Sequence, residues 1–242
     1  MTRSRNAQIL ERLNAFQGGL VVSCQARPGN PLHGADSMAR MARAAELGGA
    51  RALRANGPAD LKAILEVTSL PLMAINKVEH PNSQVMITPT VDSATALLEV
   101  GADIVALDAT NRPRPNGERL HDVVQAIHDA GAVAMGDLSS RDDLEGALAA
   151  DIDAVGTTLS GYTGGPVPDE PDFDLLAWLV KSSPVPVFAE GRYWAPEQVT
   201  RAFELGASFV VVGTAITNPM AITSRFQRAI DDIRSTNQRG HR

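Results

Sequence analysis

The sequence lacks the features that mark secreted, membrane-spanning and metal-rich proteins. Its one cysteine, Cys24, excludes an internal disulfide bond, so we expect a reducing compartment such as the cytoplasm. No apolar run is long enough to cross a membrane, and no apolar segment follows the N-terminal arginines as in a signal peptide. The histidines show no metal-ligand spacing and no GxGxxG motif opens a helix, so we expect no metal and no cofactor.

Charge of one sign is not concentrated anywhere in the chain. The formal net charge is −6, and the lysines and arginines are scattered along the sequence. A protein that binds nucleic acid or an anionic membrane usually carries a basic patch or stripe, so neither partner is expected. Any basic site must therefore be local and suited to a small ligand.

Aromatic residues are also scarce. They make up 4% of a chain that is 44% hydrophobic, so Val, Ile, Leu and Ala must fill the core. This composition is typical of parallel strands that are buried on both faces. The length of 242 residues is close to that of a closed eight-stranded α/β barrel, which has about 250.

A single unit recurs along the chain: an apolar run with a polar end, followed by a segment of helical periodicity. The runs end about 27 residues apart on average. The predicted strands are Gly19–Gln25, Arg51–Arg54, Leu72–Lys77, Ile104–Asp108, Val133–Asp137, Ala154–Thr157, Pro186–Glu190 and Phe209–Gly213. The predicted helices are Ser37–Leu47, Pro58–Thr68, Asp92–Val100, Arg119–Ala130, Ser140–Ala149, Phe173–Lys181, Pro196–Leu205 and a last one near Pro219–Ile233.

This repeat predicts an α/β fold: a single-domain (β/α)8 TIM barrel of the phosphate-binding type over residues 1–242. Before the first strand, a short N-terminal helix marked by Ile9, Leu10, Leu13 and Phe16 is expected to close the bottom of the barrel. Residues 1–8 and the polar residues 235–242 are expected to be frayed.

Polar residues stand at the predicted carboxyl ends of the strands, where the side chains of a barrel enzyme meet at the active site. Converging charges need a ligand or one another as partners. These strand-end candidates are Gln25, Arg54, Lys77, Asp108, Asp137, Thr157, Thr158 and Glu190.

Lys77 and Glu190 are the candidates for catalysis. A lysine at a strand end can also reach out to water, and Glu190 can be no more than its ion-pair partner. Together, however, they supply the acid and base that move a proton on carbon, because a desolvated lysine can lose its proton near neutral pH. Of the aspartates, we expect Asp108 to brace an arginine and Asp137 to belong to the site. Arg54 either binds an anion, which we favour, or pairs with Asp108.

Two glycine-containing loops indicate a phosphate site. Gly191-Arg192 follows the seventh strand and Gly213-Thr214 follows the eighth, where barrels often bind phosphate with backbone N–H groups. The Gly/Pro-rich loop from Gly161 to Pro166 is expected to be a lid or a loop at the opening of the barrel. Cys24 is expected to pack in the core, and the histidines, His33, His80, His121, His128 and His241, are expected at the surface or in loops.

Several sequence segments resemble those of the bacterial N-acetylmannosamine-6-phosphate 2-epimerases of sialic acid breakdown. They include Ser23-Cys24-Gln25, Leu53-Arg54-Ala55-Asn56-Gly57, Thr157-Thr158-Leu159-Ser160-Gly161-Tyr162-Thr163, Ala189-Glu190-Gly191-Arg192 and Val212-Gly213-Thr214-Ala215-Ile216. The resemblance implies metal-free interconversion of N-acetylmannosamine 6-phosphate and N-acetylglucosamine 6-phosphate. It also implies that Lys77 moves the C2 proton and that Glu190 assists. By the same resemblance, Gln25, Arg54 and Asp137 line the sugar pocket and the two glycine loops hold the phosphate. The resemblance further implies a homodimer.

The chain departs from the family pattern at Val78–Pro81 and at Asn218, where the family often has an arginine. These changes bear on substrate affinity more than on reaction type. Two other functions stay open. One is another phosphate-binding barrel enzyme such as a pentose-phosphate 3-epimerase, which usually needs strand-end histidines that are absent here. The other is a non-catalytic sensor of amino-sugar phosphates, which has no need of the Lys77 and Glu190 pair.

Overall fold

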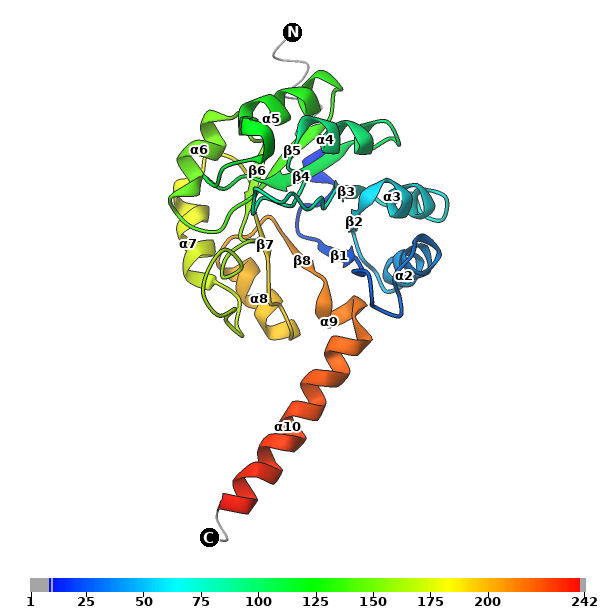
Figure 1. Ribbon diagram of the computed structural model, residues 1–242, viewed down its shortest axis with the longest axis vertical. Coiled ribbons are helices and arrows are strands. Elements are labelled where there is room, and N and C mark those ends of the chain that lie inside the picture. The colour runs from blue at the N-terminus through cyan, green and yellow to red at the C-terminus, as the bar shows by residue number, and fades with distance from the viewer. Residues whose placement is uncertain (1–8, 10, 240–242) are drawn as a thin grey trace.

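Eight parallel strands form a closed barrel in the computed structural model, which describes residue 9 and residues 11–239 (Figure 1). Each strand pairs with its sequence neighbour, and β1 pairs with β8 to close the ring. The strands are β1 (Leu20–Cys24), β2 (Ala52–Asn56), β3 (Leu72–Ile75), β4 (Ile104–Asp108), β5 (Val133–Asp137), β6 (Ala154–Gly156), β7 (Val187–Glu190) and β8 (Phe209–Val212). The predicted (β/α)8 fold is confirmed.

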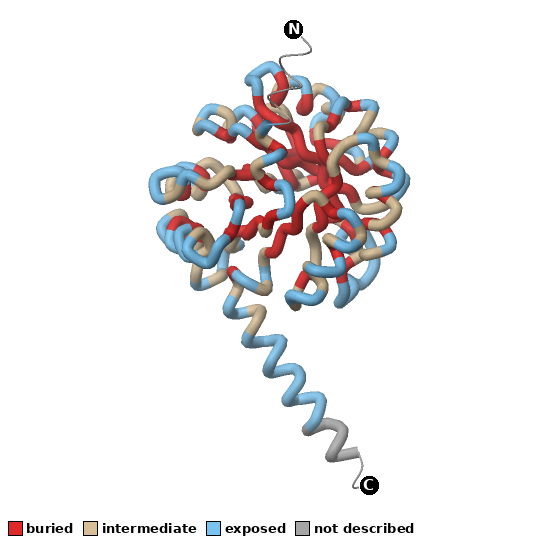
Figure 2. The backbone as a smooth tube through the Cα atoms, turned by 180° about the vertical axis from the view of Figure 1, so that it is seen from behind, coloured by how far each residue is buried: buried red, intermediate tan, exposed pale blue. Residues whose placement is uncertain are grey.

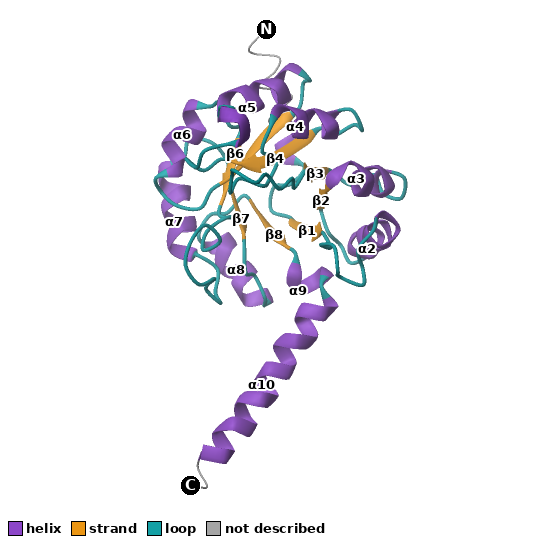
Figure 3. Ribbon diagram, viewed as in Figure 1, coloured by secondary structure: helices purple, strands orange, loops and turns teal. Residues whose placement is uncertain are grey.

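Apart from the last one, the helices surround the barrel as a ring (Figure 3). They are α2 (Ala35–Leu47), α3 (Gly57–Leu65), α4 (Val91–Leu98), α5 (Leu120–Asp129), α6 (Asp143–Ala149), α7 (Phe173–Ser182), α8 (Pro196–Glu204), α9 (Thr214–Thr217) and α10 (Pro219–Arg239), with a 3₁₀ turn at Pro115–Gly117. Ile9 and residues 11–14 are helical, which fits the expected N-terminal helix. Of the residues expected to be frayed, 1–8 and 240–242 lie outside the described residues, as do Leu10 and His241, whereas 235–239 are not frayed but continue the last helix.

The last helix differs from its predicted extent and place. α10 continues to Arg239 instead of ending near Ile233, and it leaves the barrel and extends away from it (Figure 1). Residues 223–233 of this helix are exposed (Figure 2). Among the described residues, no helix is both long enough and apolar enough to cross a membrane.

The core has two layers, which follow from the alternation of side chains along each strand. One set of alternate residues, such as Ala52, Met73 and Met135, packs inside the barrel. The other set, such as Leu53 and Ala74, packs outward against the helices, together with Cys24. Cys24 is fully buried, as expected of a packing residue, and burial raises the pKa of its thiol to about 12.

Three aromatic rings form a column inside the barrel, toward the amino-terminal ends of the strands. Phe16 lies 5.1 Å from Phe209, and Phe209 stacks on Phe188 at 5.1 Å between ring centroids. Gly156 of β6 leaves the space that the Phe188 ring fills, because a Cβ atom at Gly156 would lie 2.2 Å from Phe188 Cε2. The absence of a side chain at Gly156 is therefore a packing requirement of the barrel interior.

We expect Gly156→Ala to lower the free energy of unfolding by about 1–3 kcal/mol, because the added methyl group overpacks a filled core. Urea unfolding of both proteins measures the change. Gly164→Ala is the matched control, since a Cβ atom there would meet nothing within 4 Å. A change within about 0.5 kcal/mol is expected for this control. Equal stability of the Gly156→Ala protein and the wild type would contradict the packing argument.

His128 is not in a loop or at the surface, which corrects the expectation for this histidine. It lies near the end of α5 with only 2% of its side chain exposed, and its Nε2 is 2.9 Å from Asp153 Oδ2. The same carboxylate oxygen accepts a hydrogen bond from Ala134 N. His128 thus joins α5 to the amino-terminal ends of β5 and β6, at the opposite end of the barrel from the predicted site.

Candidate active site

Strand alternation brings four charged side chains to one end of the barrel interior. Each follows by two positions a residue that packs inside the barrel, so its side chain points to the same interior, one layer closer to the carboxyl end. These four are Arg54 after Ala52, Lys77 after Ile75, Asp137 after Met135, and Glu190 after Phe188. The structure thus places them at the carboxyl-terminal opening of the barrel, here called the mouth. This is where the sequence predicts the site.

A buried arginine joins the two carboxylates of the mouth. Arg54 is 1% exposed, and its Nη2 lies 2.6 Å from Asp137 Oδ2 while its Nη1 lies 2.7 Å from Glu190 Oε2. Burial opposes the charge of Arg54, but the two carboxylates outweigh burial and raise its pKa above the usual value. Arg54 Nε is buried with no hydrogen-bond partner among the described residues, so it is free to donate to a ligand.

Two threonines complete the surroundings of Glu190. Thr158 Oγ1 donates to Asp137 Oδ1 at 2.6 Å and lies 3.2 Å from Glu190 Oε2. Thr157 Oγ1 donates to the Glu190 carbonyl and accepts from its N–H, which fixes the backbone. Burial, only partly offset by Arg54, raises the pKa of Glu190 to about 7. Glu190 can therefore both give and take a proton near neutral pH.

Lys77 pairs with an amide and not with a carboxylate. Its Nζ donates to Gln25 Oε1 at 2.7 Å, and Gln25 Nε2 in turn donates to Ser23 Oγ at 2.6 Å. Burial, together with the charges of Arg54 and Arg27, lowers the pKa of Lys77 to about 8. Roughly a tenth of this lysine is thus neutral at pH 7 and able to act as a base.

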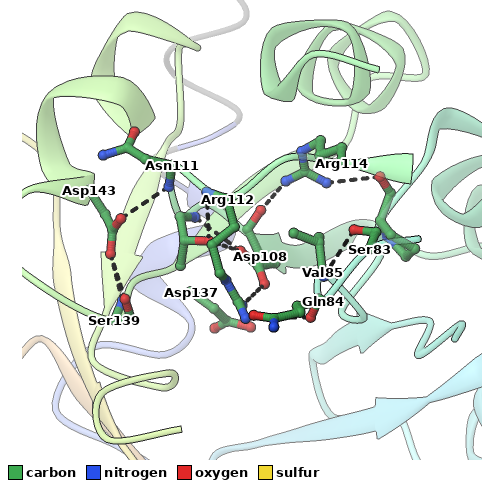
Figure 4. A network of polar contacts seen from close by, with 12 residues as sticks. Ser83, Gln84, Val85, Asp108, Asn111, Arg112, Arg114, Asp137, Ser139 and Asp143 are labelled. Atoms are coloured by element: carbon green, nitrogen blue, oxygen red, sulfur yellow. Dashed lines mark hydrogen bonds and ion pairs between the residues drawn. The ribbon is translucent and has the colours of Figure 1, made fainter. Parts of the chain in front are cut away.

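Asp108 also points to the mouth, yet it belongs to a separate network in the loops after β3 and β4 (Figure 4). Its carboxylate accepts from Arg112 and from both the N–H and the hydroxyl of Thr110. Arg114 donates to the Asp108 carbonyl. Asp108 therefore braces an arginine, as expected. The alternative pairing of Arg54 with Asp108 is wrong, because Arg54 is bound by Asp137 and Glu190.

The two glycine loops flank the same end of the barrel. Gly191 has a φ of 109° and Arg192 a φ of 63°, a left-handed pair that turns the chain after β7. Gly213 directly precedes α9. The Arg192 guanidinium donates to the Ser160 and Glu170 carbonyls, which lie on either side of the 161–166 segment. Two nitrogens of the Arg192 side chain are therefore engaged by the protein itself.

Sequence reasoning missed several residues that hold the mouth in shape. Asn56 Oδ1 accepts from Lys77 N, which fixes Lys77 beyond the end of β3. Asp143 accepts from Asn111 N and Ser139 N, and so links the loops after β4 and β5 (Figure 4). Ser23 supports Gln25. Their position in the sequence could have identified them, since most of these residues end a strand or follow one by a few positions.

The fold and this mouth define a class of protein: an α/β barrel with a desolvated lysine and a carboxylate of raised pKa at the carboxyl ends of its strands, the kind of perturbed pair that marks many active sites. Residues 38–232 match the family described as "Putative N-acetylmannosamine-6-phosphate epimerase". The chain belongs to this N-acetylmannosamine-6-phosphate epimerase family, and it is an isomerase.

Relatives in other bacteria agree with this assignment. The chain is 46% identical over 215 residues to a Clostridium perfringens protein named "Putative N-acetylmannosamine-6-phosphate 2-epimerase", covering 88% of this chain and 97% of that protein. A Clostridioides difficile protein of the same name is 44% identical over 220 residues, covering 90% and 99%. The solved structure of the N-acetylmannosamine-6-phosphate 2-epimerase from Clostridium perfringens superimposes with a TM-score of 0.88 at 45% identity, covering 90% of this chain and 95% of that one.

Proposed function

We propose that the protein interconverts N-acetylmannosamine 6-phosphate and N-acetylglucosamine 6-phosphate by removing and returning the proton at C2, as a step of sialic acid catabolism. The observation that supports this most is the presence, at the same end of the barrel, of Lys77, whose pKa is lowered to about 8, and Glu190, whose pKa is raised to about 7. A proton-transfer pair of this kind is what distinguishes an epimerase from a sensor.

The chemistry requires an acidic C2–H bond. This hydrogen becomes acidic only when C1 is a carbonyl, so the sugar reacts in its open-chain form and passes through an enolate-like intermediate. Neutral Lys77 exchanges the C2 proton, and Glu190 assists by giving or taking a proton. Arg54 Nε, which has no partner among the described residues, donates a hydrogen bond to an oxygen of the sugar. Thr158, whose hydroxyl proton goes to Asp137, accepts one from a sugar hydroxyl. Gln25 and Asp137 line the same pocket.

The phosphate binds at the far end of the substrate. Backbone N–H groups of Gly191 and Arg192 after β7, and of Gly213 and Thr214 after β8, hold its oxygens. Binding energy from this remote group holds C2 in register with Lys77 during proton transfer.

The protein acts as a homodimer, and α10 supports this proposal. Phe226, Ile230 and Ile233 of α10 are spaced four and three residues apart, so they share one helix face, and they are 71%, 46% and 63% exposed. A second copy of the chain would bury this apolar face. A sedimentation mass of 25.6 kDa, that of one chain, would contradict the dimer.

Incubation in D2O tests the reaction. With N-acetylmannosamine 6-phosphate and a chelator present, NMR is expected to show the gluco product with deuterium at C2, because the proton exchanges with solvent on the enzyme. Binding of the phosphosugar without product and without exchange at C2 would contradict the epimerase proposal and favour a sensor.

The rate is expected to depend on pH through Lys77. Below its pKa of about 8 the lysine is protonated and cannot accept a proton, so kcat/KM falls about tenfold per pH unit from pH 7.5 downward. It is expected to level off as the pH rises past 8. Initial rates between pH 6 and 9 measure this profile, with protein stability checked at each pH. A flat profile from pH 6 to 8 would show that Lys77 is not the titrating base.

A further inference from the structure

Arg27 lies in the loop between β1 and α2, two residues after Gln25, and its side chain is exposed. Within the part of the chain that the structure describes, the Arg27 side chain makes no hydrogen bond and no ion pair. It is nevertheless close enough to Lys77 for its charge to act on that residue. Arg27 is thus a cation at the rim of the mouth with no partner of its own.

The loop that carries Arg27 is fastened to the turn after β8. Thr217 Oγ1 donates to the Ser23 carbonyl at 2.8 Å, on one side of Arg27. Asn30 Nδ2 donates to Asn218 Oδ1 at 3.3 Å, on the other side. Arg27 is therefore held between two contacts with the segment that opens at Gly213-Thr214, one of the two loops proposed to bind phosphate.

Other arginines at this end of the barrel are already engaged. Arg54 is bound by two carboxylates. Arg192 donates to backbone carbonyls, and its guanidinium lies 5.4 Å from the centre of the Tyr162 ring. Arg225 of α10 lies 4.6 Å from the centre of the Trp194 ring. A guanidinium without a carboxylate or ring partner is the one best placed to bind an anion, to which it can donate hydrogen bonds.

We propose that Arg27 binds the phosphate group of the substrate, as the charged partner of the backbone N–H groups at Gly213-Thr214. This rests on the proposed function. The charge of the mouth agrees with it: three cations, Lys77, Arg54 and Arg27, face two carboxylates, Asp137 and Glu190, and an anionic substrate offsets the excess. A phosphate offers Arg27 the bidentate geometry that its guanidinium prefers.

Arg27 also acts on Lys77 from a distance. Around the Lys77 ammonium, Arg54 and Arg27 lower its pKa, and Glu190 and Asp137 raise it. Removal of the Arg27 charge is expected to raise the pKa of Lys77 and to move the acid limb of the kcat/KM profile to higher pH. A loop residue with a purely structural role would not move this limb.

The test compares Arg27→Gln with the wild type. Because charge-assisted hydrogen bonds are lost, KM for N-acetylmannosamine 6-phosphate is expected to rise about 10- to 100-fold, with kcat at saturation above pH 9 little changed. Arg27→Lys keeps the charge and is expected to recover part of the loss. Arg40→Gln is the matched control, since Arg40 is an exposed arginine on α2 that pairs with Asp36 on the same helix. Its KM is expected to stay within twofold of the wild type.

Binding of inorganic phosphate distinguishes a failure of the Arg27 proposal from a failure of the epimerase proposal. The dissociation constant of phosphate, measured by calorimetry, is expected to rise about tenfold or more in Arg27→Gln and to stay unchanged in Arg40→Gln. An unchanged KM and an unchanged phosphate affinity in Arg27→Gln would overturn the role of Arg27. So would an equal loss of affinity for unphosphorylated N-acetylmannosamine. A wild type that binds phosphate through Arg27 but shows no turnover would instead overturn the epimerase proposal alone.

Discussion

Replacing Lys77 with alanine is expected to lower kcat about 1,000-fold, because positioned acid–base groups typically contribute 10²- to 10⁴-fold. The effect should fall on kcat far more than on KM, since the phosphate is held elsewhere. The side chain of Lys77 contacts Gln25 through one hydrogen bond and is otherwise desolvated, so its loss should not unfold the barrel. Initial rates and the C2 deuterium content of the product, followed by NMR, measure the loss.

Lys62→Ala is the control for this variant. Lys62 is an exposed lysine on α3, and its replacement is expected to leave both kcat and deuterium incorporation unchanged. Deuterium incorporation at the wild-type rate in Lys77→Ala would assign the base to another residue, with Glu190 the first to examine. Loss of incorporation in Lys62→Ala as well would mean that the assay reports damage to the fold and not the chemistry.

Replacing Arg54 with methionine is expected to lower the free energy of unfolding by about 3–5 kcal/mol. Arg54 is 1% exposed and binds Asp137 and Glu190 together, so methionine leaves two buried carboxylates without their ion-pair partner. For a chain of this length the melting temperature should fall by roughly 6–20 °C. Thermal unfolding followed by circular dichroism measures the shift.

Arg201→Met supplies the comparison, because Arg201 pairs with Glu204 on the surface of α8, where both side chains are more than half exposed. Exposed pairs contribute little, so a loss below about 1 kcal/mol is expected. A matching small loss in Arg54→Met would show that water or a proton replaces the guanidinium at little cost. Arg54 would then serve ligand binding alone.

The order and type of the elements could be predicted from the sequence because both faces of each strand are buried, which leaves an unbroken apolar run. β4 and β5 have the predicted bounds, Ile104–Asp108 and Val133–Asp137. β3 ends at Ile75 and not at Lys77, since side chains take over there: Asn76 N donates to Thr88 Oγ1 and Lys77 N to Asn56 Oδ1. Such bonds join distant segments, and an apolar run cannot reveal them.

The same limit applies to the mouth. The fold rule that strand ends converge was enough to select Lys77, Glu190, Arg54 and Asp137. Their partners depend on which rotamers fit across the barrel, so the sequence left Arg54 open between a ligand and Asp108, whereas it binds Asp137 and Glu190. The burial of His128 was missed for a related reason, because its partner Asp153 is 25 residues away along the chain.

The aromatic column has a consequence for how the molecule can move. Phe188, two residues before Glu190, rests on Phe209, which contacts Phe16, and Gly156 leaves no spare volume beside it. A packed interior of this kind resists compression and small displacements. The floor beneath Glu190 should therefore stay still on the timescale of turnover. Ring opening, closure over the sugar and product release then depend on motions of the surrounding loops. We therefore expect these loop motions to limit the rate of the catalytic cycle.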